Sequence, residues 1–192
     1  MEKTEHKGRF QYYSFARRVA FQLLYQEDLN PGTSTDINED FISSELRGLC
    51  KKSESDEKSE QDPLTAKKEE YAELPINEDI EADSPVSPKD FRKLIRFVKE
   101  LVEGTLAHRD QIDQIIGNVA EHWSVSRMAK TDRNIIRLAV FEMIRKKTPK
   151  AVVIHEALSL GYQFGTGNSS AFMNGILDKI DLSIDWDNLR NE

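Results

Sequence analysis

Apolar residues recur at every third or fourth position through most of this chain, and this spacing restricts the possible fold more than any other feature. Such a stripe forms one face of an α-helix. Six segments show it: 14–27, 91–104, 112–123, 135–144, 152–164 and 172–180. No segment alternates apolar and polar residues between hairpin turns, and the valine-rich run at 151–154 lies inside a helical pattern. The sequence therefore predicts an all-α bundle of five to seven helices.

Local chemistry marks several helix ends. Ser87 can cap a helix, and Pro88 suits its first turn because its φ is fixed and it lacks an N–H donor. The apolar stripe that follows predicts an end at Gly104. Thr131 can cap a later helix, and Pro149 prevents that helix from continuing. These positions predict short links between most of the helices.

Charge is distributed unevenly along the 192 residues, whose formal net charge is −7. Residues 31–90 hold 17 acidic and 7 basic side chains, a net of −10, so 20 basic and 17 acidic side chains remain elsewhere, a net of +3. The same stretch holds five of the six prolines and the run KKSESDEKSEQD. Its composition predicts a disordered acidic insertion over 51–86, preceded by a short helix over 37–49. We expect one domain over 1–192, with the insertion inside it.

Several classes of protein are not expected. A single cysteine, Cys50, provides neither a disulfide framework nor a CxxC zinc site, and it fits a reducing, cytoplasmic compartment. No apolar run is long enough for a membrane span, and the first residues lack the apolar core of a signal peptide. His155-Glu156 begins like a zinc-protease helix, but Ser159 stands where the second histidine belongs. We therefore expect no enzyme, no metal site and no cofactor.

The N-terminal segment carries the residue types that bind single-stranded RNA. Basic and aromatic side chains lie together there: Lys7, Arg9, Arg17 and Arg18 among Phe10, Tyr12, Tyr13 and Phe15. Basic groups neutralise phosphates, and exposed rings offer stacking surfaces for unpaired bases. The alternative is that the rings belong to the core and the arginines to an ordinary solvated face.

The link FGTGNSSAFMNG at 164–175 is a second candidate. Two glycines precede a helix that Asn168 or Ser169 can cap, and a helix start offers free N–H groups to a phosphate. Phe172 falls one turn into that helix. It either faces the core or stays exposed as a platform for a base.

Four segments resemble the NusB family of transcription antitermination factors: ARRVAFQLLYQ at 16–26, TDRNIIRLAVFEMI at 131–144, AVVIHEALSLGYQFGT at 151–166 and NSSAFMNGILDKI at 168–180. The resemblance implies two small helical subdomains and a binding function without catalysis. It also implies pairing with the ribosomal protein NusE and binding of boxA-type RNA in ribosomal RNA leader transcripts. The complex then helps RNA polymerase to resist termination.

The resemblance also assigns residues. RNA binding is expected of two groups of residues, Arg9, Arg17, Arg18 and Arg137 in the first and Phe164, Asn168, Ser169 and Phe172 in the second. Tyr25 and Asp132 correspond to positions that face the ribosomal protein, although an acidic residue at 132 also complements the dipole of its own helix.

This chain departs from the family pattern in three places. The usual arginine run before the first helix is reduced to Lys7 and Arg9, which predicts a shallower salt dependence. The acidic residues common in the link are replaced by Gly167-Asn168, which favours RNA. The acidic insertion is not expected in the family. It is either an inert solvated loop, which we favour, or a competitor of RNA for the basic face.

Two other functions compete with RNA-dependent antitermination. One is a protein-interaction module with weakened RNA binding, which the thinned arginine run favours. The other is the NusB-like domain of an rRNA cytosine methyltransferase. That reading requires a following α/β domain with a cofactor loop, and these 192 residues hold none.

Overall fold

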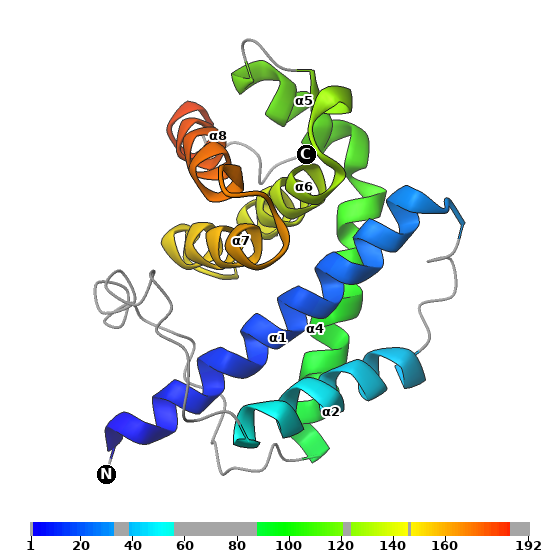
Figure 1. Cartoon of the computed structure of the whole chain (residues 1–192), viewed down its shortest axis with the longest axis vertical. Helices are drawn as coiled ribbons and strands as arrows, with labels where there is room; N and C mark the ends of the chain where they lie inside the picture. The colour runs from blue at the N-terminus through cyan, green and yellow to red at the C-terminus, as the bar shows by residue number, and fades with distance from the viewer. Residues whose placement is uncertain (1, 33–38, 56–87, 121–123, 146, 185–192) are drawn as a thin grey trace. The chain divides into compact units, whose positions relative to one another are not determined.

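The computed structural model of this chain describes residues 2–32, 39–55, 88–120, 124–145 and 147–184, without the side chains of 2–10, 49–55 and 88. Every regular element in these residues is helical (Figure 1): α1 (Glu2–Leu29), α2 (Glu39–Ser55), α4 (Pro88–Ala107), α5 (Arg109–Val119), the 3-10 turn η1 (Val125–Arg127), α6 (Lys130–Arg145), α7 (Lys150–Phe164) and α8 (Ser169–Ser183). The all-α prediction is confirmed. The chain forms two compact units, residues 1–102 and 103–192, and α4 runs through the boundary between them.

The first unit contains α1, α2 and most of α4. Each helix contributes the buried apolar face that its spacing predicts, comprising Ala16, Val19, Ala20, Leu23 and Leu24 of α1, Ile42 and Leu46 of α2, and Leu94, Val98, Leu101 and Val102 of α4. The ring of Tyr13 on α1 meets that of Phe97 on α4 edge-on, with centroids 5.0 Å apart. Lys99 Nζ on α4 donates to Glu39 Oε1 on α2 over 2.9 Å. Side chains of α4 therefore contact both other helices.

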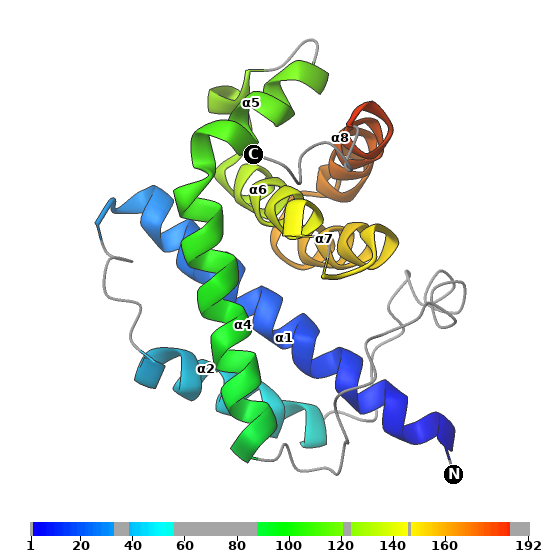
Figure 2. The ribbon, with the colours of Figure 1, turned by 180° about the vertical axis from the view of Figure 1, so that it is seen from behind.

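The second unit contains the end of α4 and the helices α5 to α8. α7 packs against α6 and α8, and α5 packs against the same two helices. The four helices can be followed from both sides in Figures 1 and 2. α6 is buried over most of its length because Ile135, Ile136, Val140 and Met143 are all fully enclosed.

Two helices are longer than their apolar patterns predict. α1 begins at Glu2 rather than near Ser14, and α2 continues to Ser55. Residues 51–55 are therefore helical, and the predicted insertion does not begin at 51. Both extensions lack proline and a regular apolar stripe, so each helix propagates outward from turns that tertiary packing already fixes. Periodicity detects only the packed turns.

Gly104 does not end its helix, as the sequence predicts, but lies inside α4, which ends at Ala107. A Cβ atom at this position would collide with the ring of Phe141 on α6. The glycine is therefore needed for close packing of α4 against α6. This requirement is not visible in the residues around position 104.

The other predicted ends divide into three groups. Pro88 starts α4, Gly165 follows α7, and the helix predicted over 37–49 is present as α2. Thr131 is not a cap, because the Arg133 N–H donates to the Ala129 carbonyl and places Thr131 inside the first turn of α6. The predictions for Ser87, for Trp123 and for the insertion over 56–86 concern positions outside the described residues.

Candidate RNA interface

Arg17 lies inside the first unit rather than on a solvated face. Its side chain is only 5% exposed, and its guanidinium carbon lies 5.3 Å from the centre of the Phe97 ring. Tyr13 meets the same ring from α1. A guanidinium over an aromatic face is held by cation–π attraction. Arg17 therefore joins α1 to α4, and its charge lies beside the aromatic pair.

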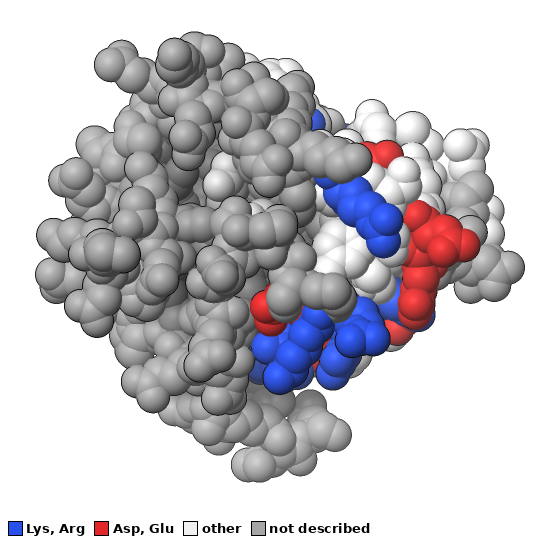
Figure 3. All heavy atoms as spheres, turned by 90° about the horizontal axis from the view of Figure 1, so that it is seen from below, with Lys and Arg blue, Asp and Glu red and all other residues white. Residues whose placement is uncertain are grey.

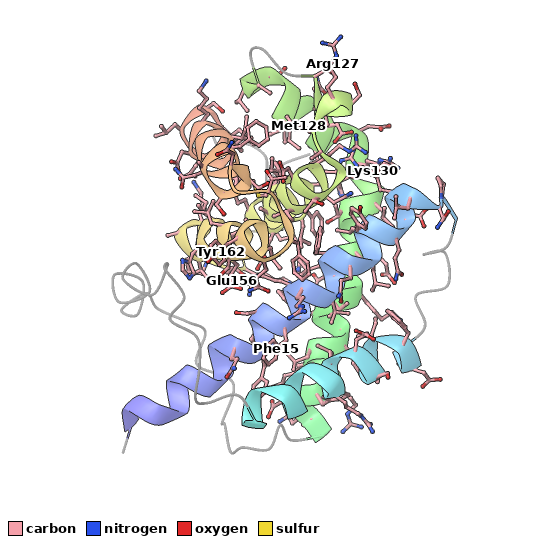
Figure 4. The ribbon with its side chains drawn as sticks, viewed as in Figure 1. Phe15, Arg127, Met128, Lys130, Glu156 and Tyr162 are labelled. Carbon is pink, nitrogen blue, oxygen red and sulfur yellow. The ribbon has the colours of Figure 1, made fainter. Side chains whose placement is uncertain are left out.

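The remaining α1 candidates are more accessible. Arg18 is half-buried, and Phe15 is half-buried with its ring edge-on to that of Tyr12, 6.5 Å between centroids. Figure 4 shows Phe15 on α1. Arg9 lies on the same helix, but its side chain is not described. The predicted basic and aromatic segment is thus a continuous helix and not an extended arm.

Tyr25, predicted to face a partner, is half-buried on α1. Its ring lies 6.0 Å from that of Phe21, which is buried in the core. This contact supports one side of the tyrosine ring. The other surface is partly open to solvent.

In the second unit, the link between α7 and α8 is closed by Ser169. The Ser169 side chain is 1% exposed, and its Oγ accepts a hydrogen bond from the Thr166 N–H over 2.8 Å. A Cβ on Gly165 would collide with Ser169, so the tight link requires glycine there. Asn168 occupies the exposed N-cap position of α8, but its side chain accepts no bond from the first turn. The Ser169 N–H already donates to the Thr166 carbonyl over 2.9 Å, so an anion at this helix start would meet the N–H groups that follow Ser169.

Two half-buried rings flank this link, Phe164 at the end of α7 and Phe172 in the first turn of α8. The partial exposure of Phe172 is compatible with both predictions, a ring that packs in the core and a ring that stacks on a base. Tyr162 on α7, shown in Figure 4, is 60% exposed and lies in the last turn before the link.

Arg137 is held by a carboxylate. It is 6% exposed on α6, and its Nε and Nη2 donate to the two oxygens of Asp113 on α5 over 2.7 and 2.6 Å. A bidentate pair of this kind fixes the guanidinium plane. Its charge is therefore already matched inside the second unit.

Asp132 lies in the first turn of α6, where the helix dipole favours a carboxylate. It is 8% exposed, and its Oδ1 has no hydrogen-bond partner among the described residues. Neither observation tests the predicted partner contact.

Other chemistry is sparse in the described residues. His155 is buried on α7, and no three His, Cys, Asp or Glu side chains of the described chain come together as metal ligands. Within the same residues, no helix is long and apolar enough to cross a membrane.

The predicted site residues divide between the two units. Arg9, Arg17, Arg18 and Tyr25 lie on α1, whereas the residues from Asp132 to Phe172 lie in the second unit. The sequence did not predict two residues that contact the site arginines. Phe97 lies beneath Arg17, and Asp113 lies beside Arg137. Phe97 lies off the main apolar stripe of its helix. This position was the one sequence signal that could have indicated its contact with Arg17.

The elements together define an all-α protein of two small helical units. Comparison with known families is specific: the chain belongs to the NusB family, whose family model matches residues 58–181.

Individual relatives match over a shorter part. Over 91 residues the chain is 45% identical to the transcription antitermination protein NusB of Myxococcus xanthus, covering 47% of this chain and 65% of that protein. Over 87 residues it is 52% identical to the corresponding protein of Desulforamulus reducens, covering 45% of this chain and 61% of that one. The matched part spans less than two thirds of the length of these relatives.

Solved structures share the fold over more of the chain. T. maritima NusB matches with a TM-score of 0.53 and 24% identity, covering 88% of this chain and 89% of that one. A crystal structure of antitermination factors NusB and NusE in complex with double-stranded RNA matches with a TM-score of 0.55 and 21% identity. The match covers 90% of this chain and 98% of that one. The helical architecture is therefore that of known NusB structures.

Proposed function

We propose that this protein is an RNA-binding transcription antitermination factor without catalytic activity, acting in the cytoplasm. It binds boxA-type single-stranded RNA of ribosomal RNA leaders together with the ribosomal protein NusE, and joins the antitermination complex on RNA polymerase. The observation that carries the proposal is the α7–α8 link of a NusB-family chain, where an exposed helix start lies between Phe164 and Phe172.

The predicted site residues then have two roles. Arg18, Phe164, Asn168 and Phe172 are exposed enough to contact RNA, and Arg9 lies on the same helix as Arg18. Arg17, Arg137 and Ser169 are buried in contacts with their own unit, so in this proposal they position the elements that bind. Tyr25 and Asp132 are assigned to the ribosomal partner.

Replacement of Phe172 tests the proposal at the link. If its ring stacks on a base, Phe172→Leu should weaken binding of a boxA-type RNA by about 1–3 kcal/mol, because the side chain stays apolar but loses its π-face. Phe172→Tyr retains the π-face and serves as the matched control. Affinity is measured at about 50 mM salt, where phosphate contacts are strongest, and thermal unfolding is followed in parallel.

The result can contradict the proposal in two ways. Loss of thermal stability with normal affinity makes Phe172 a core residue and removes the platform. Absence of RNA binding by the unaltered protein, both alone and with the ribosomal partner, overturns the RNA function itself.

A second candidate is a protein-interaction module with weakened RNA binding. One observation favours it: the charges of Arg17 and Arg137 are engaged by Phe97 and Asp113. Binding of the ribosomal partner without any gain in RNA affinity would support this candidate.

A further inference from the structure

The first three turns of α4 carry a row of cations on the side of the helix away from the core. We call Lys89, Arg92 and Arg96 the α4 basic stripe; at 3.6 residues per turn, they fall within about 60° around the helix axis. The buried Leu94 and Val98 lie on the opposite side. Figure 3 views the molecule from the side on which α4 begins and shows Lys and Arg side chains there, with Asp and Glu side chains beside them.

These three cations are exposed, and no described residue neutralises them. Each lies open to solvent, and none forms an ion pair with any residue that the structure describes. Their neighbours behave differently, because Lys93 pairs with Asp90 over 3.2 Å and Lys99 pairs with Glu39 over 2.9 Å. The stripe thus differs from Lys93 and Lys99, the basic residues of the same helix whose charges are matched by a carboxylate.

Helix stability does not account for this arrangement. The positive end of the helix dipole lies at the N-terminus, so cations in the first turns oppose it and acidic residues there favour it. In α4 Lys89 shares the first turn with the acidic Asp90, the last turn has no basic residue, and the exposed acidic Glu103 comes late. Apart from Asp90, the charges are reversed relative to what the helix itself favours. An external anion accounts for the reversal, because it gains from both the side chains and the dipole.

The stripe adjoins the α1 contact that contains Arg17. Phe97 follows Arg96 directly and carries the guanidinium of Arg17 over its ring. Lys93, one turn earlier, lies on the same side of α4 as Phe97. The stripe therefore lies next to the contact between α1 and α4, within one unit.

We propose that the α4 basic stripe binds the phosphate backbone of RNA that flanks the boxA-type element. This inference rests on the proposed RNA function and extends its site to a second helix. A row of cations at intervals of three and four residues spans about 10 Å along α4, and it fits a strand whose charges repeat along its length. Contacts of this kind are independent of base sequence, so the stripe adds affinity without adding base preference.

The experiment compares two RNAs on the full chain. One is a short RNA with only the boxA-type element, and the other carries about ten added uridines on each side. The variant is K89Q/R92Q/R96Q, and the matched control R109Q/R127Q/K179Q removes the same charge from exposed positions of the second unit. In Figure 4 the Arg127 side chain points away from the helices of that unit.

We expect the unaltered protein to bind the long RNA more tightly and with a salt slope steeper by about 2, since each phosphate contact on a single strand contributes about 0.7. That slope corresponds to about a 20-fold larger loss of affinity between 50 and 200 mM salt. In the stripe variant the long RNA should behave like the short one, and short-RNA affinity should stay unchanged. The control should retain the difference. The melting temperature of the stripe variant should not fall, because the three side chains are exposed and form no ion pair with any residue that the structure describes.

Three results would overturn the inference: equal affinity of the unaltered protein for both RNAs, an unchanged slope in the stripe variant, or equal losses in variant and control. Binding of a poly-glutamate peptide by the unaltered protein and not by the variant, with long-RNA affinity unchanged, would assign the stripe to an acidic protein segment. Short-RNA binding by the unaltered protein reports on the proposed function separately. If the unaltered protein does not bind the short RNA, the proposed function is wrong. If it binds the short RNA but the stripe variant behaves like the control, only the inference about the stripe is wrong.

Discussion

At the scale of single residues, the ion pair with Asp113 holds Arg137, an arginine predicted to bind RNA, inside its own unit. The guanidinium is buried and its carboxylate partner is partly open to solvent, with 7% and 29% of the side chains exposed. Sequence gives Arg137 through its place in a family motif, but the partner lies 24 residues away on another helix. Only the packing of α5 against α6 brings the two together.

Asp113→Asn should lower the free energy of unfolding by about 1–3 kcal/mol. The full cost of leaving a buried charge unpaired is about 3–5 kcal/mol, and the partial exposure of Asp113 together with the remaining amide oxygen reduces it. Asp110→Asn on the same helix is the control, since Asp110 is exposed and contributes only through the helix dipole, about 0.3–1 kcal/mol. Denaturant unfolding measures both. An Asp113→Asn protein of normal stability that loses RNA affinity would instead place Arg137 at the RNA.

At the scale of elements, two boundaries followed from local signals, whereas the local cap signal at Thr131 was wrong. The start of α4 follows from Pro88 and Asp90, and the α7–α8 link follows from Gly165 and Asn168. The start of α1 could not be found because the sequence of its first turns shows no apolar stripe. Gly104 was misread because its function depends on Phe141, which lies on a helix much further along the chain.

Replacement of Gly104 by Ala should therefore destabilise the protein, although alanine is the better helix former. Overpacking against the Phe141 ring costs about 1–3 kcal/mol net, whereas Gly117→Ala on α5, with nothing within 4 Å, should stabilise by about 0.5–1 kcal/mol. Thermal unfolding of both variants gives the comparison. Adding Phe141→Leu to Gly104→Ala should recover part of the loss through their coupling. Equal behaviour of the two alanine variants would mean that α4 and α6 do not approach closely.

At the scale of the whole molecule, net charge is a poor guide to partners because it averages unlike parts. Residues 56–86 hold eleven acidic and three basic side chains, a net of −8, so the remaining residues carry 24 basic and 23 acidic side chains, a net of +1. The basic stripe of α4 begins directly after this acidic sequence. The question for the whole chain is whether that sequence competes with RNA.

Deletion of 56–86, with about eight Gly and Ser residues in its place, tests the competition without cutting into α2, which ends at Ser55. Shortening the connection should stabilise the fold by about 1 kcal/mol, since each halving of a flexible loop recovers about 0.6 kcal/mol. We expect RNA affinity at about 50 mM salt to change by less than about threefold, because a sequence of this composition commonly stays solvated. A matched variant that keeps the length but replaces the eleven acidic residues by Gln and Ser separates charge from loop length. A tenfold gain in RNA affinity in both variants would show instead that the acidic sequence occupies the basic surface.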